Sequence, residues 1–83
     1  LEKIYRQALQ YVRKEDWDKA VALLERVKAV NAQYKDAAKH LLYAKGRQAF
    51  EQGKSKKAGA NFKAVEGFRD ARNWVFQADW KLQ

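Results

Sequence analysis

The side chains that most often carry out catalysis are few in this chain, and the sequence does not group them. Ser55 is the only serine, His40 is the only histidine, and cysteine is absent. A serine nucleophile needs a base beside it, but Ser55 and His40 belong to different predicted helices. Ser55 also has a structural role, because a serine hydroxyl can cap the start of a helix. We therefore predict that the protein is not an enzyme and has no catalytic residues.

Residues that could hold a metal ion or a cofactor are also sparse. Only Asp36, among the acidic residues, lies at helical spacing from His40, and such pairs are common on solvated helix faces. Asp16 and Asp18 follow a turn, where they suit capping or contact with solvent. The sequence has no Gly-rich phosphate loop. A metal site needs clustered ligands, so we expect no metal and no cofactor.

The composition favours helices throughout the chain. Ala, Lys, Gln, Leu, Glu and Arg dominate and proline is absent, and these residues lose little free energy on entering a helix. Apolar residues recur at helical spacing between short polar breaks, which predicts an all-α chain. The expected helices span residues 2–14, 17–30, 35–52, 55–66 and 69–82. Because the connections are short, consecutive helices should run antiparallel.

Two of the breaks carry recognisable turn chemistry. Asp16 and Ser55 are expected to cap the helices that follow them. Gly53 suits the left-handed conformation that commonly ends a helix. We therefore expect tight turns near residues 14–16 and 53–55.

The chain is basic, with 18 Lys and Arg against 10 Asp and Glu and a formal net charge of +8. This charge favours anionic partners in general, and it does not select among acidic proteins, nucleic acid and anionic lipid. No stretch approaches the ~20 apolar residues of a membrane-spanning helix. The chain begins at Leu1, which favours an excised fragment of a larger protein or a processed protein. The cellular location stays open.

The sequence repeats itself. A shift of 38 residues places the first and second helices on the third and fourth, and it preserves the order of small and large apolar residues. A shift of 34 residues places the segment Tyr34–Ala37 on the segment Phe68–Ala71. A fixed period of this length indicates stacked helical units. In such units a small side chain lets the neighbouring helix approach, and large ones fill the remaining space.

These residues resemble the tetratricopeptide repeat. The family has a small residue midway along the first helix of each repeat, and Ala8 and Gly46 match it. Gly53 matches the glycine of its turn, and Ala20 and Ala58 match the small residue early in its second helix. The two aromatic-x-Asp-Ala segments look like a signature of bacterial tetratricopeptide-like arrays. The resemblance implies a short α-solenoid of about two and a half antiparallel hairpins, with repeats at about 1–34 and 35–67 and a terminal helix at about 68–83. Glu15 departs from the pattern, because glycine is usual there.

The resemblance also implies a function as a non-catalytic scaffold that binds a protein partner. In this family the first helix of each hairpin lines a concave surface, which here would bind a peptide or helix, with acidic ones among the candidates. The residues carried over to that surface are Tyr5, Leu9, Val12, Arg13, His40, Tyr43, Arg47 and Phe50. Aromatic and aliphatic anchors would supply desolvation, and arginine would supply bidentate contacts with carboxylates. The alternative is that Val12 and Phe50 belong to the core between repeats, while Tyr5 and Tyr43 only cover neighbouring residues.

Two other functions are kept as alternatives. One is a basic module that binds nucleic acid through the lysines around the start of the fourth helix, together with Arg69 and Arg72. The other is a purely architectural segment that joins other domains. Acidic residues interspersed among the basic ones weaken the first alternative, and a charged solvated face explains the same lysines.

The last predicted helix has a second apolar stripe. Phe76 and Trp80 lie four residues apart, opposite the face that would pack on the preceding hairpin. The terminal helix of a solenoid is expected to have a polar outer face. We therefore expect either that the chain ends inside a third repeat or that Phe76 and Trp80 mediate a homo-oligomer contact. Partial coverage by Trp74 is the alternative.

Overall fold

The computed structural model describes residues 2–82, and the side chains of residues 2–77. The described part is helical with short connections and contains no strand. Its helices are α1 (Glu2–Arg13), α2 (Trp17–Val30), α3 (Ala37–Glu51), α4 (Ser55–Lys63) and α5 (Ala71–Leu82). The prediction of an all-α chain is confirmed.

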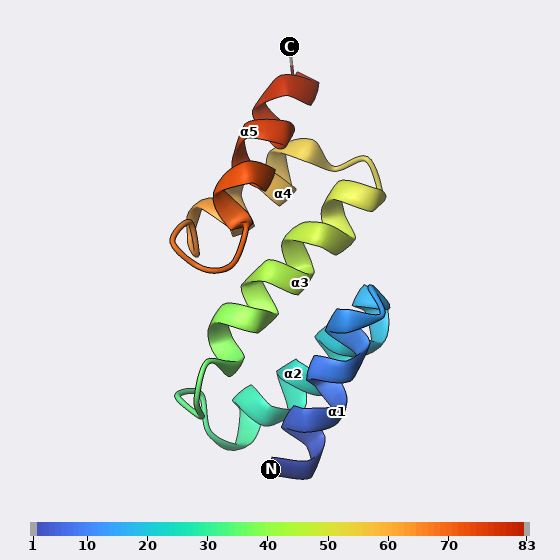
Figure 1. Ribbon diagram of the computed structural model, residues 1–83, viewed down its shortest axis with the longest axis vertical. Coiled ribbons are helices and arrows are strands. Elements are labelled where there is room, and N and C mark those ends of the chain that lie inside the picture. Colours follow the sequence, from blue (N-terminus) through green and yellow to red (C-terminus); the bar gives the residue numbers. More distant parts are fainter. Residues whose placement is uncertain (1, 83) are drawn as a thin grey trace.

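Each helix packs against the helices that precede and follow it in the chain. Figure 1 shows α3 running through the middle of an elongated molecule, with the α1–α2 hairpin near one end and α4 and α5 near the other. The molecule measures 41 × 21 × 18 Å along its principal axes. The fold is thus a short α-solenoid of stacked antiparallel hairpins, as expected.

Small side chains at the helix crossings set the distance between the helices. Ala8, Ala20 and Ala58 are completely buried, and so is Phe62. A Cβ atom built on Gly46 would lie 2.8 Å from the ring of Phe62, which is closer than van der Waals contact allows. The aromatic ring of α4 therefore packs directly on the backbone of α3, and a side chain at residue 46 would push the two helices apart.

The turn between α1 and α2 repeats in the turn between α3 and α4. Glu15 and Gly53 both adopt the left-handed conformation, with φ of 60° and 78°. In each turn the N–H of this residue donates to the carbonyl three residues earlier, and the next N–H donates to the carbonyl five residues earlier, at 2.8–3.1 Å. The left-handed region favours glycine, so Glu15 holds a conformation that costs a side chain roughly 1 kcal/mol.

A second pair of turns precedes α3 and α5. Lys35 and Arg69 both have positive φ, 45° and 53°, and a residue in that region cannot belong to a right-handed helix. For this reason α3 and α5 begin at Ala37 and Ala71, two residues later than expected. The expected ends of α1, α3 and α4 were also too late, at residues 14, 52 and 66, because those positions lie in turns.

The caps of α2 and α4 differ. The carboxylate of Asp16 accepts the backbone N–H of Lys19 at 3.5 Å, so the predicted cap of α2 is confirmed. The cap position of α4 is Lys54, which makes no side-chain capping bond, and Ser55 is the first residue of the helix itself. The prediction that Ser55 caps α4 is therefore wrong. No helix in the described part of the chain is long and apolar enough to cross a membrane.

Candidate functional site

Three of the eight residues predicted to line the binding surface are in the core. The exposed fractions of Tyr5, Val12 and Tyr43 are 7%, 2% and 2%. Each lies on the side of α1 or α3 that the neighbouring helices cover. These side chains have no surface to offer a partner, which corrects the expectation that they line the groove.

Tyr43 joins α3 to the turn before α5. Its hydroxyl donates a hydrogen bond to the carboxylate of Asp70, and its ring meets Trp17 edge-on at 5.9 Å between ring centres. The guanidinium carbon of Arg69 lies 4.9 Å from the centre of the same ring. Burial and the hydrogen bond to Asp70 raise the pKa of Tyr43 above its usual value. Tyr43 is therefore a fixed part of the contact between hairpins.

Arg47 is held between two tryptophans. Its guanidinium carbon lies 4.7 Å from the ring centre of Trp17 and 3.9 Å from that of Trp74. Its Nη2 donates to the carboxylate of Glu15 at 2.7 Å, and only 14% of the side chain is exposed. Such geometry combines cation–π attraction with a charge-assisted hydrogen bond. Arg47 was expected to bind a partner's carboxylate, but Glu15 of the first turn occupies that role.

His40 and Phe50 cover the contacts between hairpins on either side of Arg47. The ring of His40 lies 4.7 Å from that of Phe68, and the ring of Phe50 lies 5.0 Å from that of Trp74. Burial lowers the pKa of His40, the positive charge of Arg69 lowers it further, and Asp36 partly opposes both. Phe50 therefore takes the alternative place between the repeats. The contact of His40 was not predicted, because its partner Phe68 comes from a later part of the chain.

The start of the chain repeats the same kind of contact. Tyr34 lies with its ring centre 5.5 Å from that of Tyr5, and its hydroxyl donates to the carboxylate of Glu2. The ammonium group of Lys35 lies 2.7 Å from a Glu2 oxygen and 5.6 Å from the centre of the Tyr5 ring. The hydrogen bonds from Lys35 and Tyr34 lower the pKa of Glu2 from 4.5 to about 2. Glu2 was not among the residues predicted from the sequence.

Arg13 is the exposed member of the predicted surface, and Leu9 beside it is half-buried against the core. Together with Arg6 and Gln10 they line a shallow pocket of about 240 Å³ on α1. Arg13 is exposed and has no ion-pair partner among the described residues, whereas Arg6 pairs with Glu2 at 3.2 Å. This pocket offers an apolar patch beside a free guanidinium group.

A basic surface covers α4. Lys54, Lys56, Lys57 and Lys63 are all exposed, and none of them forms an ion pair with a described residue. The helix contains no acidic side chain. These lysines are the basis of the nucleic-acid alternative, whereas Arg69, which was grouped with them, is packed on the Tyr43 ring.

The face predicted on the last helix is seen in part. Phe76 is 70% exposed, while the side chain of Trp80 lies outside the described residues. Trp74 does not cover Phe76 from outside, because its ring packs inward on Phe50 and Phe62.

In the described part of the chain no three acidic, His or Cys side chains come together as a metal site would require.

Comparisons with protein-family models, with curated proteins and with solved structures found no match.

Proposed function

We propose that this chain is a non-catalytic protein-interaction module of the tetratricopeptide-like kind, which binds a peptide or helix on its concave surface, through the part of that surface that α1 contributes. The observation that carries the proposal is the pocket of Arg6, Leu9, Gln10 and Arg13. An apolar side chain of the partner would be desolvated on Leu9, while a neighbouring carboxylate would bind Arg13 in bidentate fashion.

The contacts between the hairpins support this function. Arg47, held by Trp17, Trp74 and Glu15, ties α2, α3, α5 and the first turn together. A surface whose helices are fixed in advance loses less entropy when a partner binds. The buried residues that the sequence placed on the groove therefore act indirectly, by holding the accessible ones in place.

A selection experiment tests the proposal. Peptides from a random display library would be selected on the wild-type chain, and their affinities measured for the double variant Leu9→Ala/Arg13→Glu. We expect a loss of roughly tenfold or more, because the variant removes the apolar contact and reverses the charge. The matched control is Leu23→Ala/Lys28→Glu on α2, which likewise truncates a half-buried leucine and reverses an exposed positive charge.

Two outcomes would contradict the proposal. One is a selection that enriches no sequence family on the wild-type chain. The other is a set of enriched peptides that bind the Leu9→Ala/Arg13→Glu variant as tightly as the wild type. The second outcome would favour the architectural alternative, which the use of Tyr43 and Arg47 in internal contacts also supports.

We also propose that the exposed Phe76 takes part in a contact between copies of the chain, together with Trp80 of the same helix. Large apolar side chains that stay exposed mark surfaces for contact with other proteins, and Phe76 is 70% exposed. Replacing both residues by serine and measuring the mass in solution tests this. If the wild-type chain is already a monomer at high concentration, self-association through this face is excluded.

A further inference from the structure

A polar pocket lies where α2, α3 and α4 meet. Its volume is about 370 Å³. Buried Val21 and Ala49 form its apolar floor, and amide and charged side chains surround them. The surrounding residues are Glu25, Lys45, Gln48, Gln52, Lys54, Lys57 and Asn61. Because both hairpins contribute side chains, the pocket exists only in the assembled fold.

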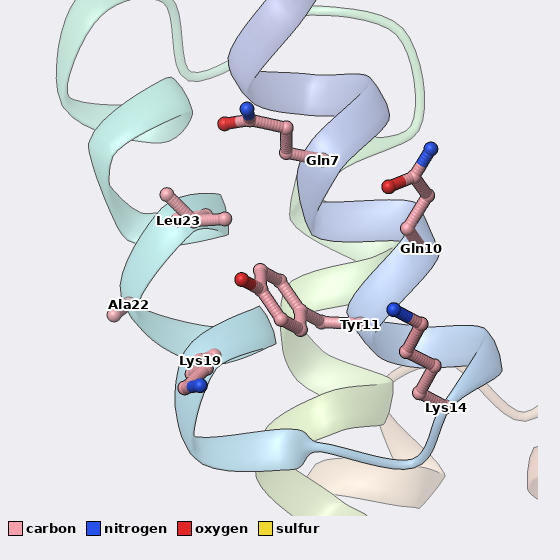
Figure 2. A pocket seen from close by; sticks show the side chains of 7 residues that line it. All are labelled: Gln7, Gln10, Tyr11, Lys14, Lys19, Ala22 and Leu23. Carbon is pink, nitrogen blue, oxygen red and sulfur yellow. The ribbon is translucent and has the colours of Figure 1, made fainter.

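The corresponding groove of the first hairpin has a different lining. The 38-residue shift places Tyr11 on Ala49 and Leu23 on Asn61. Figure 2 shows the Tyr11 ring between α1 and α2, facing Leu23, with Lys19 nearby. The ammonium group of Lys19 lies 5.5 Å from the centre of that ring. Both grooves carry lysines, but the first is partly aromatic, whereas amide and charged side chains surround the second and no aromatic side chain lines it.

The pocket already holds one carboxylate. The ammonium nitrogen of Lys45 lies 3.1 Å from an oxygen of Glu25, which is the only acidic residue in the lining. The other two lysines of the pocket, Lys54 and Lys57, have no ion-pair partner in the described part of the chain. The charges of Lys54 and Lys57 are thus not offset by a carboxylate of the described residues, and they lie in the same pocket as the Lys45–Glu25 ion pair.

These features select a class of ligand. Two ammonium groups beside the amides of Gln52 and Asn61 can donate hydrogen bonds to carboxylate oxygens. No aromatic side chain lines the pocket, whereas proteins that bind single-stranded nucleic acid combine basic grooves with aromatic platforms. We propose that this pocket binds a carboxylate side chain of an acidic peptide segment in a partner protein, through Lys54 and Lys57. The inference concerns a second surface and does not depend on binding at Leu9 and Arg13.

Fluorescence anisotropy tests the proposal with a labelled peptide of alternating glutamate and alanine at low salt. We expect the double variant Lys54→Glu/Lys57→Glu to bind this peptide roughly tenfold more weakly than the wild type. The matched control Lys14→Glu/Lys28→Glu changes two exposed, unpaired lysines of the first hairpin. Each double variant lowers the net charge from +8 to +4, since each substitution lowers the charge by two. The control should lose less than about twofold.

The loss of binding must come from the pocket and not from unfolding or from the lower net charge. Acidic side chains at a helix start are favourable, so the Lys54→Glu/Lys57→Glu variant should remain folded, which circular dichroism would verify. Equal losses in both double variants would show a diffuse effect of net charge and overturn the proposal. Tighter binding of a thymidine oligonucleotide than of the peptide would overturn it in favour of nucleic acid.

Lysine side-chain NMR locates the contact directly. On addition of the peptide, the Cε resonances of Lys54 and Lys57 should shift, while those of Lys14 and Lys28 should not. Peptide binding that leaves Lys54 and Lys57 unshifted would overturn the proposal. A Leu9→Ala/Arg13→Glu variant that binds this peptide normally would show that the peptide does not bind at the pocket of α1.

Discussion

The α1–α2 turn and the α3–α4 turn have the same backbone conformation, but the first carries acidic side chains and the second carries basic ones. Both turns place one residue at positive φ and make the same two backbone hydrogen bonds. The first turn then supplies Asp16 as a cap, and the second supplies Lys54 at the same position without a cap. The first is followed by a helix of 14 residues, and the second by a helix of 9 residues.

The side chains of the first turn bind the two hairpins together. Glu15 and Trp17 hold Arg47, and Asp18 accepts a hydrogen bond from Gln48 at 2.6 Å. The second turn replaces these residues with Gly53, Ser55 and Lys56, which form no such contacts in the described structure. The first turn therefore stabilises the contact between the hairpins, while the second leaves the positive charges of Lys54 and Lys56 exposed.

The largest expected effect is at Trp17. Trp17→Ala should destabilise the chain by about 3–5 kcal/mol, because it removes a buried ring that contacts Tyr43 and Arg47. Ser55→Ala, at the equivalent position of the second turn, should change stability by less than about 0.5 kcal/mol. Urea unfolding followed by circular dichroism measures both. Similar costs at the two positions would remove the difference between the turns.

The next effect tests the crossing of α3 and α4. Gly46→Ala should destabilise by about 1–3 kcal/mol, because the added methyl group meets the Phe62 ring. The first hairpin already carries alanine at the matching position, Ala8, so Ala8→Gly should also destabilise, by about 1 kcal/mol. If Gly46→Ala raised the unfolding midpoint instead, as helix propensity alone would predict, the close approach would be disproved.

A smaller effect comes from transferring the cap between turns. Lys54→Asp should stabilise α4 by about 1 kcal/mol, since the new carboxylate can cap the helix and favours its positive end. Asp16→Ala should destabilise by about the same amount. Thermal unfolding measures both changes, and the peptide titration should show that the stabilised Lys54→Asp variant binds more weakly. If the Lys54→Asp variant gains stability and keeps its affinity for the peptide, then Lys54 does not exchange stability for peptide binding.

The smallest expected effect is on the pH dependence of stability. It compares two residues that contact the turns before α3 and α5: Glu2 binds Tyr34 and Lys35, and His40 packs on Phe68. The pKa of His40 is lowered in the fold, so its contribution is fully present above about pH 6.5 and declines as the pH falls below that value. The pKa of Glu2 is lowered to about 2, so its contribution is present above pH 4.5 and is lost as the pH falls towards 2.

Unfolding midpoints measured across this pH range should therefore fall in two stages. His40→Gln should flatten the upper stage, and Glu2→Gln should flatten the lower one. A single transition that neither substitution alters would show that these two groups do not control acid stability.

Much of the fold followed from the sequence alone. Helix-forming composition and helical periodicity determined the number, order and approximate limits of the helices. The 38-residue shift paired Ala8 with Gly46, which are both small and buried. It also paired Glu15 with Gly53, which adopt the same left-handed conformation at the end of a helix. The 34-residue shift likewise paired Lys35 with Arg69, which adopt the same backbone conformation.

The accessible surface was decided only by tertiary structure. Periodicity places Tyr43 and Arg47 on one side of a helix, but it does not reveal which distant residues cover them. Trp17 and Trp74 lie far from Arg47 in the sequence, and their rings convert an expected binding residue into an internal one. A helix inside a solenoid meets neighbours on two sides, so burial depends on packing between hairpins and not on the local pattern.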